Sequence, residues 1–305
     1  MSQMVHGNRA SLSKRTIRVI TFCATLAAPM LVAQTQTAAP RHTRLRTVAE
    51  QIFKLDGTRE AFDNAIAFHE AAFEQARADP NLRDRLSSAD VQAAAKWIHL
   101  MFGPDFADGY MHGFLEAFDE THARTVLQWL ESSQVRKFSE LERVLTQPGM
   151  HEDLNRFLNS SRGWPAQSER RKELLKRFAE MSRCPEDNLD QAVNTPLLIE
   201  SVRNQRRPPE EKRSKADFQR IEKEMRDSMR EGIANGCWWP LLYVYRDVSD
   251  DDLERYLAFY ETDAGKWYRK AHRSGSHQAY FAGAMRVAQA GFDWPSMPET
   301  IRKKE

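Results

Sequence analysis

Apolar residues recur at spacings of three and four along most of this chain, from residue 43 onward. Val48, Ile52 and Phe53 form one such group, and Phe62 and Ile66 begin the next. This spacing places apolar side chains on one face of an α-helix, whereas a half-buried strand alternates apolar and polar residues. Strict alternation is almost absent from the sequence. The pattern therefore predicts an all-α protein.

Proline, glycine and capping residues divide this pattern into separate helices. Ser249 stands before an acidic run at 250–252, and apolar residues at helical spacing follow it. A serine N-cap and acids in the first turn both favour a helix start, so we expect a helix from residue 250. Proline is disfavoured inside a helix, so it marks a break or a first helical turn. Such positions are Asp79-Pro80, Gly103-Pro104, Gln147-Pro148-Gly149, Trp164-Pro165 and Pro208-Pro209.

The chain resembles itself when it is shifted by 130 residues. The shift aligns Trp129 with Phe259, Leu127 with Leu257, and the two Trp-Pro pairs near residues 164 and 294. Identities are few, but the apolar positions stay in register. A repeat of this size indicates duplicated domains. We therefore predict two tandem, related helical bundles at 44–165 and 166–295, followed by a charged tail at 296–305. Two unrelated bundles are the alternative.

The N-terminal residues have the pattern of a secretory signal peptide. Residues 1–18 are basic and contain no acid, and the apolar run Val19–Ala33 follows them. This run is shorter than the roughly 20 apolar residues of a membrane-spanning helix. We expect cleavage after Ala33, or as late as Ala39, and then a flexible leader at 34–43. The mature protein is then periplasmic or secreted. An uncleaved N-terminal anchor is the alternative.

The charge balance gives no reason to expect an anionic polymer as partner. The formal net charge of the whole chain is +2. Residues 1–33 hold four basic side chains and no acid, so cleavage changes this charge to −2. The basic stretch Arg203–Lys215 is interrupted by Glu210 and Glu211, and we interpret it as a solvated linker and helix start. We predict no nucleic-acid partner and no stable membrane span.

Export also changes the interpretation of the cysteines. Cys23 lies in the apolar run, so cleavage leaves Cys184 and Cys237. An even pair in an oxidising compartment favours a disulfide. Two buried thiols are the alternative, because free cysteine is also common in protein cores.

The stretch Val248–Tyr268, VSDDDLERYLAFYETDAGKWY, resembles the signature of an exported bacterial helical family known as domain of unknown function 2059. The matching positions include Phe259, Tyr260, Thr262 and Gly265, and Asp263 replaces the usual proline. The starts of both halves, at 48–68 and 178–193, are similar to that family's opening helices. The resemblance implies an all-α exported protein with no assigned catalytic residues.

The signature also has a physical interpretation. Thr262 is expected to cap a helix that begins at Asp263, and Gly265 lets that helix approach the preceding one without a Cβ between them. Phe259 and Tyr260 then lie at a tight helix-helix corner. We expect the four family positions to be structural, and the aromatic residues at this corner, Phe259, Tyr260, Trp267 and Tyr268, to pack in the core.

The sequence lacks the common motifs of catalytic sites. The sequence has no HExxH, CxxC, GxSxG, GxGxxG or phosphate-binding loop, and we therefore assign no catalytic, cofactor-binding or metal-binding residue. Glu131 and Glu261 occupy equivalent places in the two halves, and paired carboxylates serve hydrolysis in some enzymes. Helix capping is the simpler interpretation of both. His151, followed by two acids, is interpreted as part of a helix start rather than as a cation site.

The most apolar stretch after residue 33 is Cys237–Tyr245, CWWPLLYVY. One interpretation is a groove for an apolar ligand, lined by Trp238, Trp239 and Tyr243. A buried central helix is the simpler alternative. The sequence therefore predicts a non-enzymatic binding or interaction protein of the bacterial envelope. Its partner is an envelope protein, a hydrophobic ligand or a second copy of the chain. An envelope hydrolase with paired carboxylates and a carrier of a hydrophobic small molecule are the alternatives.

Overall fold

The computed structural model of the chain describes residues 43–78, 87–147, 149–160 and 162–292. These residues form helices and no strand, so the predicted all-α class is confirmed. The predicted signal peptide and charged tail, and the leader up to residue 42, lie outside the described residues. No helix within the described ranges has the length and apolar character that crossing a membrane requires.

Residues 45–55 are helical, and further helices follow along the chain. In chain order these are α2 (Thr58–Ala78), α4 (Ser88–Met101), α5 (Asp105–Glu116), α6 (Glu120–Glu131), α7 (Ser133–Glu142), η1 (Arg143–Thr146), α8 (Met150–Leu158), η2 (Trp164–Ala166), α9 (Glu169–Ser182), α10 (Cys184–Arg206), η3 (Pro209–Glu211), α11 (Lys215–Val244), α12 (Asp250–Glu261) and α13 (Asp263–Gln289).

Side-chain caps determine where several helices begin. The hydroxyl of Ser249 accepts a hydrogen bond from the backbone N–H of Asp252 at 3.1 Å, and α12 begins at residue 250 as predicted. Ser87 and Ser214 begin α4 and α11 through capping boxes with the aspartate three residues later. Each cap satisfies a backbone donor that a helix start otherwise leaves unpaired. Local sequence therefore fixes these helix ends.

The predicted division into two separate bundles is not confirmed. Residues from Leu45 onward form one compact unit. Its larger apolar core packs Phe53 and Phe138 of the first half together with Tyr245 and Tyr256 of the second. The two halves therefore bury their apolar faces against each other. Two independent bundles would instead each have a separate core.

The shift of 130 residues nevertheless relates helices in the two halves. The bounds of α6 and α12 coincide under this shift, and α7 and α13 begin at equivalent residues. Ser132 and Thr262 are the equivalent N-caps of α7 and α13. Each hydroxyl donates to the carbonyl three residues earlier and accepts from the N–H three residues later. Trp129 and Phe259, also equivalent, stack with ring centroids 3.9 Å apart. The duplication stays a prediction, and this correspondence supports it.

The corner between α12 and α13 has the structure expected of Thr262 and Gly265. Thr262 caps α13 by accepting the N–H of Gly265 at 3.1 Å. A Cβ on Gly265 would lie 2.2 Å from the carbonyl oxygen of Phe259, so a larger residue would push the two helices apart. Tyr260 is buried at the same corner. The cap, the close approach at Gly265 and the burial of Tyr260 support a structural role for these positions, which stays a prediction.

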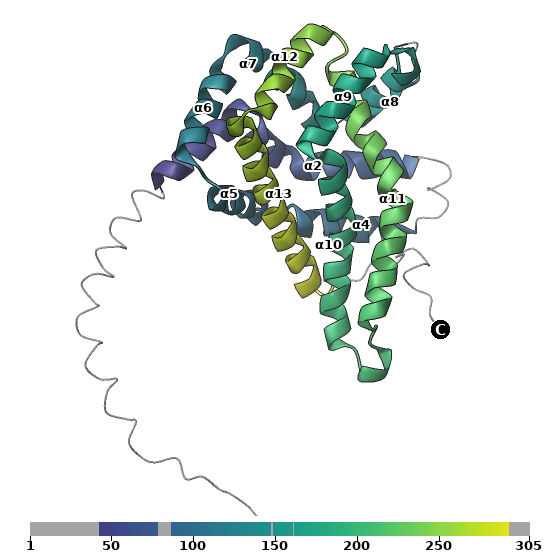
Figure 1. Ribbon diagram of the computed structural model, residues 1–305. Helices are drawn as coiled ribbons and strands as arrows, with labels where there is room; N and C mark the ends of the chain where they lie inside the picture. Colours follow the sequence, from purple (N-terminus) through teal and green to yellow (C-terminus); the bar gives the residue numbers. More distant parts are fainter. Residues whose placement is uncertain (1–42, 79–86, 148, 161, 293–305) are drawn as a thin grey trace, which may run out of the picture. The chain divides into compact units, whose positions relative to one another are not determined.

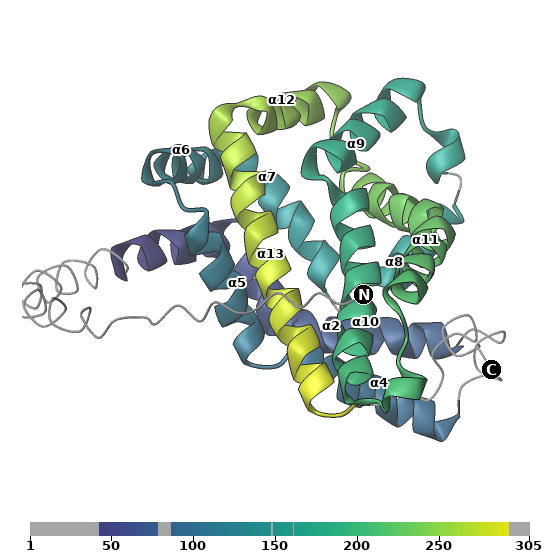
Figure 2. The same ribbon diagram turned by 60° about the horizontal axis from the view of Figure 1, so that its bottom comes forward.

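The long helix α13 packs against α4, α5 and α10 (Figures 1 and 2). Glycines allow the close approach. A Cβ on Gly283 would lie 2.6 Å from the carbonyl oxygen of Met101 in α4, and one on Gly113 would lie 2.4 Å from that of Ser274. Because backbone meets backbone at these points, α4 and α5 are held at fixed positions beside α13.

Cys184 and Cys237 form a disulfide, which confirms the prediction. The bond joins the first residue of α10 to the C-terminal half of α11, with Cα atoms 6.0 Å apart. The side-chain amide of Asn188 donates to both sulfurs, at 3.4 Å and 3.6 Å. The disulfide therefore fixes the spacing of α10 and α11 near the N-terminus of α10.

Candidate ligand-binding site

A cavity of about 630 Å³ lies among α4, α10, α11 and α13. We call it the apolar cavity, because most of its wall is carbon. Small-molecule sites in proteins commonly have roughly 300–1,000 Å³ and similarly apolar walls. The lining residues are Trp97, Met101, Asn188, Gln191, Ala192, Thr195, Pro196, Ile199, Arg203, Met225, Met229, Tyr280 and Phe292.

One face of α10 forms the longest wall of the apolar cavity. Asn188, Gln191, Thr195, Ile199 and Arg203 follow one another at spacings of three and four, so they lie on the same side of the helix. Asn188 and Arg203 are 15 positions apart, which corresponds to about 22 Å at the helical rise of about 1.5 Å per residue. The cavity is therefore bounded by about four turns of one helix.

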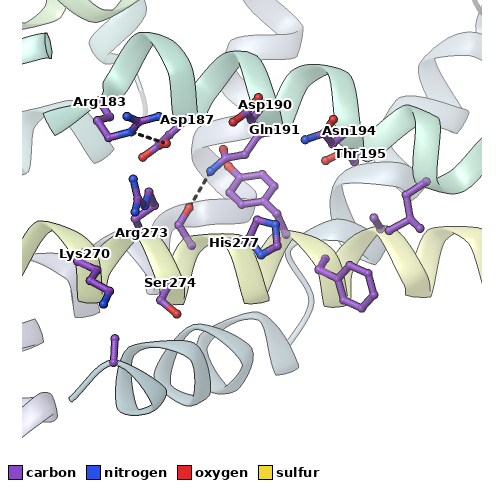
Figure 3. Close-up of a pocket in the computed structure, with 16 residues that line it drawn as sticks. Arg183, Asp187, Asp190, Gln191, Asn194, Thr195, Lys270, Arg273, Ser274 and His277 are labelled. Atoms are coloured by element: carbon purple, nitrogen blue, oxygen red, sulfur yellow. Dashed lines mark hydrogen bonds and ion pairs between the residues drawn. The ribbon is translucent and has the colours of Figure 1, made fainter. Parts of the chain in front are cut away.

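A second, more polar cavity of about 500 Å³ lies between α10 and α13, and we call it the polar cleft. Figure 3 shows the side chains of the two helices facing each other across it. Arg183 pairs with Asp187 at 3.6 Å, and the amide of Gln191 donates to the hydroxyl of Ser276 at 2.8 Å. The other charged residues in its lining are Asp190, Lys270 and Arg273.

The apolar cavity and the polar cleft are neighbours. Gln191, Thr195 and Tyr280 line both of them. A molecule in the apolar cavity therefore meets a mainly apolar wall and lies beside polar groups of α10. This arrangement suits a ligand that is mainly apolar and carries a polar group.

The end of the apolar cavity near the C-terminus of α10 contains an arginine. Among the described residues, Arg203 is the one charged residue in the cavity lining, and 18% of its side chain is exposed. It belongs to a cluster around Glu200, which is buried. The Glu200 carboxylate lies 2.8 Å from Arg207, 3.3 Å from Arg213 and 4.0 Å from Arg203. Three guanidinium groups therefore surround one buried carboxylate.

A buried carboxylate, Asp56, forms a polar network in the core. Its Oδ2 accepts a hydrogen bond from the hydroxyl of Tyr268 at 2.7 Å and lies 3.2 Å from Nε2 of His272. The hydroxyl of Tyr110 lies 2.7 Å from Nδ1 of the same histidine. Burial acts to raise the pKa of Asp56, but the bonds from His272 and Tyr268 hold it below its ordinary value.

A second buried carboxylate, Glu142, is bonded by the hydroxyls of Tyr245 and Tyr256. Burial raises the pKa of Glu142 to about 7, against the opposing effect of the two tyrosine hydroxyls. Neither Glu142 nor Asp56 lines the apolar cavity or the polar cleft. The hydrogen bonds of both networks therefore join helices, and both networks lie outside the apolar cavity and the polar cleft.

The residues predicted to line an apolar groove lie elsewhere. Trp238, Trp239 and Tyr243 line neither the apolar cavity nor the polar cleft. Trp239 is 37% exposed. The ring of Tyr243 packs edge-on against Phe157, with centroids 5.5 Å apart. A groove at this run stays a prediction, separate from the apolar cavity.

The other candidate residues also lie outside both spaces. Glu131 and Glu261 are exposed, and Glu261 pairs with Arg177. The ring of His151 packs against Phe68, with centroids 4.9 Å apart. In the part of the chain that the structure describes, no group of three His, Cys, Asp or Glu residues is arranged to hold a metal ion.

The residues that form the apolar cavity were not predicted from the sequence. The interpretation of the stretch from Arg203 as solvated linker is wrong for Arg203 itself, which lies in α10 with a largely covered side chain. The polar residues Asn188 and Gln191 share a helical face with Ile199, and this spacing is visible in the sequence. Their partners on α4 and α13 are distant along the chain, and no local pattern identifies them.

The chain was also compared with known proteins. No family model, no curated protein and no solved structure matches it. The resemblance to domain of unknown function 2059 therefore stays a prediction from the sequence. The candidate function depends on the geometry of the site.

Proposed function

We propose that this chain is an exported, non-enzymatic bacterial protein that binds an apolar small molecule in the apolar cavity. The observation that carries this proposal is the cavity itself, about 630 Å³ with a wall that includes Trp97, Met101, Met225 and Met229. Covering apolar surface contributes roughly 25 cal/mol per Å², so such a wall favours an apolar ligand. The methionines add adaptability, because their flexible side chains fit ligands of different shape.

Export is supported by two independent features. The N-terminal basic segment and apolar run have the pattern of a signal peptide. The disulfide between Cys184 and Cys237 fits an oxidising compartment, since such bonds are rare in the cytosol of most cells. We further propose membership of the exported family that the stretch 248–268 resembles.

The proposal of a binding protein rather than an enzyme is supported by the lining of the apolar cavity, whose described residues include no carboxylate, histidine, lysine or cysteine. A general acid or base must come within hydrogen-bond reach of its substrate. Asp56, His272 and Glu142 line neither this cavity nor the polar cleft. The exposed Glu131 and Glu261 also lie outside them.

The test uses the neutral fluorescent probe N-phenyl-1-naphthylamine, whose emission rises in apolar surroundings. The full exported protein is titrated with the probe and compared with two cavity variants. Ala192→Trp fills the cavity with an indole ring. Met229→Asp makes its wall polar, and Met229 is 36% exposed, so the folded state tolerates this change. The matched control is Trp239→Ala, which removes an exposed aromatic of α11 outside the cavity.

We expect the wild type and Trp239→Ala to bind the probe with similar affinity, and both cavity variants to bind it at least about tenfold more weakly. Thermal unfolding of each variant shows whether it is folded. No binding by the folded wild type would overturn the proposal. Loss of binding in Trp239→Ala alone would transfer the site to the groove predicted at Trp238, Trp239 and Tyr243.

A further inference from the structure

We infer that the polar cleft is a second binding site, which takes a small organic anion with its charged group at Lys270 and Arg273 and its apolar part against Phe281. This inference goes beyond the proposed function and does not depend on it, because the apolar cavity takes no part in it. It is carried by the pairing of charges in the cleft lining and by the order of side chains along α13.

The carboxylates in the cleft lining are already paired. Asp187 and Asp190 are the two acids among its described residues. Asp187 lies 3.6 Å from Arg183, and Asp190 lies 2.8 Å from Arg226 of α11, which is outside the lining. A cationic ligand would have to compete with these two guanidinium groups. The described part of the lining therefore offers no unpaired carboxylate to a cation.

Two basic side chains on the opposite wall are available to an anion. Lys270 and Arg273 are exposed in the cleft, and neither forms an ion pair with a residue that the structure describes. Figure 3 shows Arg273 extending from α13 toward Arg183 and Asp187. Burial raises the pKa of Asp187, and the charges of Arg273 and Arg183 act against this rise. Lys270 and Arg273 are neighbours on the helix surface, so one anion can contact both of them.

The helix α13 has no acid of its own near these two groups. After Asp263 it contains no aspartate or glutamate as far as Gln289. The lysines and arginines in that length are Lys266, Arg269, Lys270, Arg273 and Arg286. Because the cleft is open to water, salt screens the attraction of these charges for an anion. The charge of this wall therefore favours an anion, and the preference depends on salt.

The cleft also contains an exposed aromatic side chain. Phe281 is 47% exposed, more than any other large apolar side chain among the described residues. Arg273, His277 and Phe281 follow one another at intervals of four, so they lie along one side of α13. Arg273 and Phe281 are eight positions apart, about 12 Å at the helical rise of about 1.5 Å per residue. An anion with an apolar part of this length would cover Phe281, and covering apolar surface is favourable.

Arg183 has an unfavourable backbone conformation at the charged end of the cleft. Its φ is 56°, and it is the one non-glycine residue with a positive φ in the described part of the chain. Glycine is the usual residue where a helix ends in this conformation. The side chain of Arg183 lines the cleft and pairs with Asp187, so it reduces the repulsion between Asp187 and an anion. This role gives a reason for an arginine at a position that favours glycine.

The experiment titrates the full exported protein with three probes that share one carbon skeleton: 6-phenylhexanoate, 6-phenylhexan-1-ol and 6-phenylhexylammonium. Backbone amide NMR signals of Ser274 and His277 report on the cleft, and methyl signals of Met225 and Met229 report on the apolar cavity. From the amide signals, we expect 6-phenylhexanoate to bind at least about fivefold more tightly than the alcohol, as for a favourable exposed ion pair. The ammonium probe is expected to bind most weakly. Added salt is expected to weaken the anion and to leave the alcohol unchanged.

Four variants locate the charged group and the apolar part. Lys270→Gln and Arg273→Gln are each expected to weaken 6-phenylhexanoate about threefold and to leave the affinity for the alcohol unchanged. Arg230→Gln is the matched control, because Arg230 is exposed on α11 and lies outside both linings. Phe281→Ala is expected to weaken the anion and the alcohol equally. The comparison of probes on the wild type needs no variant, so misfolding of one variant would not decide the question.

The outcomes separate this inference from the proposed function. If 6-phenylhexanoate shifts the methionine signals and leaves those of Ser274 and His277 unchanged, it binds in the apolar cavity and this inference is overturned. The inference is also overturned if no probe shifts the amide signals, if the anion and the alcohol bind equally, or if the ammonium probe binds best. If neither Lys270→Gln nor Arg273→Gln weakens the anion, the placement of its charged group is overturned. Failure of N-phenyl-1-naphthylamine to bind would remove the proposed function and leave the site in the polar cleft standing.

Discussion

Removing the disulfide is expected to cost a large part of the stability of the folded unit. The bond between Cys184 and Cys237 closes a separation of 53 residues. In the chain-entropy model, a loop of this length reduces the entropy of the unfolded chain by about 14 cal/mol/K, which is about 4 kcal/mol at 25 °C. The bond also joins α10 to α11, so its loss loosens two walls of the apolar cavity.

The variant for this test is Cys184→Ser combined with Cys237→Ala. Alanine is chosen for Cys237 because this side chain is only 3% exposed, and a buried serine hydroxyl without a partner would add a separate cost. Unfolding by guanidinium chloride, followed by circular dichroism, gives the free energy of unfolding from the midpoint and the slope. We expect a decrease of about 2–4 kcal/mol in this free energy.

Reduction of the wild type provides an independent measurement of the same quantity. Wild-type protein unfolded in dithiothreitol is expected to have nearly the stability of the double variant. A decrease smaller than about 1 kcal/mol in both measurements would refute the reasoning. It would mean that the link between α10 and α11 adds little to what their packing already provides.

Three further predictions concern the corner glycine, two helix caps and Glu142, and each is tested by measuring the free energy of unfolding. Gly265→Ala is expected to destabilise the folded protein by about 1–3 kcal/mol, because its Cβ would meet backbone atoms. Gly232→Ala is the control: its Cβ meets nothing within 4 Å, and it is expected to stabilise the protein by about 1 kcal/mol. Equal effects of the two substitutions would contradict the close approach of α12 and α13 at Gly265. Thr262→Ala and Ser132→Ala remove the equivalent N-caps of α13 and α7, and each is expected to lower the free energy of unfolding by about 1 kcal/mol. A loss at one cap alone would count against the equivalence of the two helix starts. Because the pKa of Glu142 is raised to about 7 from 4.5, the folded state holds its proton more tightly, and stability is expected to fall as the pH rises between these values. The loss is about 3 kcal/mol. Glu142→Gln is expected to abolish this part of the pH dependence, and an unchanged profile would show that Glu142 does not titrate in this range.

Local features of the fold could be predicted from the sequence. The helix start at Ser249 depends on one side chain and its near neighbours, so the pattern of residues is sufficient to locate it. The corner at Thr262 and Gly265 is equally local. The disulfide was predictable for a different reason, because the expected cleavage removes Cys23, and the two remaining cysteines offer one intramolecular pairing.

Features that depend on distant contacts could not be predicted. The division into two bundles was predicted from the possible repeat, but the stack of Trp129 on Phe259 and the shared core show that the two halves pack together. The apolar cavity needs α4, α10, α11 and α13 together. Arg203 was misinterpreted for the same reason, because only the folded chain shows that its side chain is largely covered.

The methionine methyl groups report on the apolar cavity directly. Met101, Met225 and Met229 line it, whereas Met111 and Met150 are buried and line neither the cavity nor the polar cleft. In methyl NMR spectra of methionine-labelled protein, saturating N-phenyl-1-naphthylamine is expected to shift the first three signals and leave the other two unchanged. Unchanged signals of the three cavity methionines, or larger shifts at Met111 and Met150, would contradict binding in the apolar cavity.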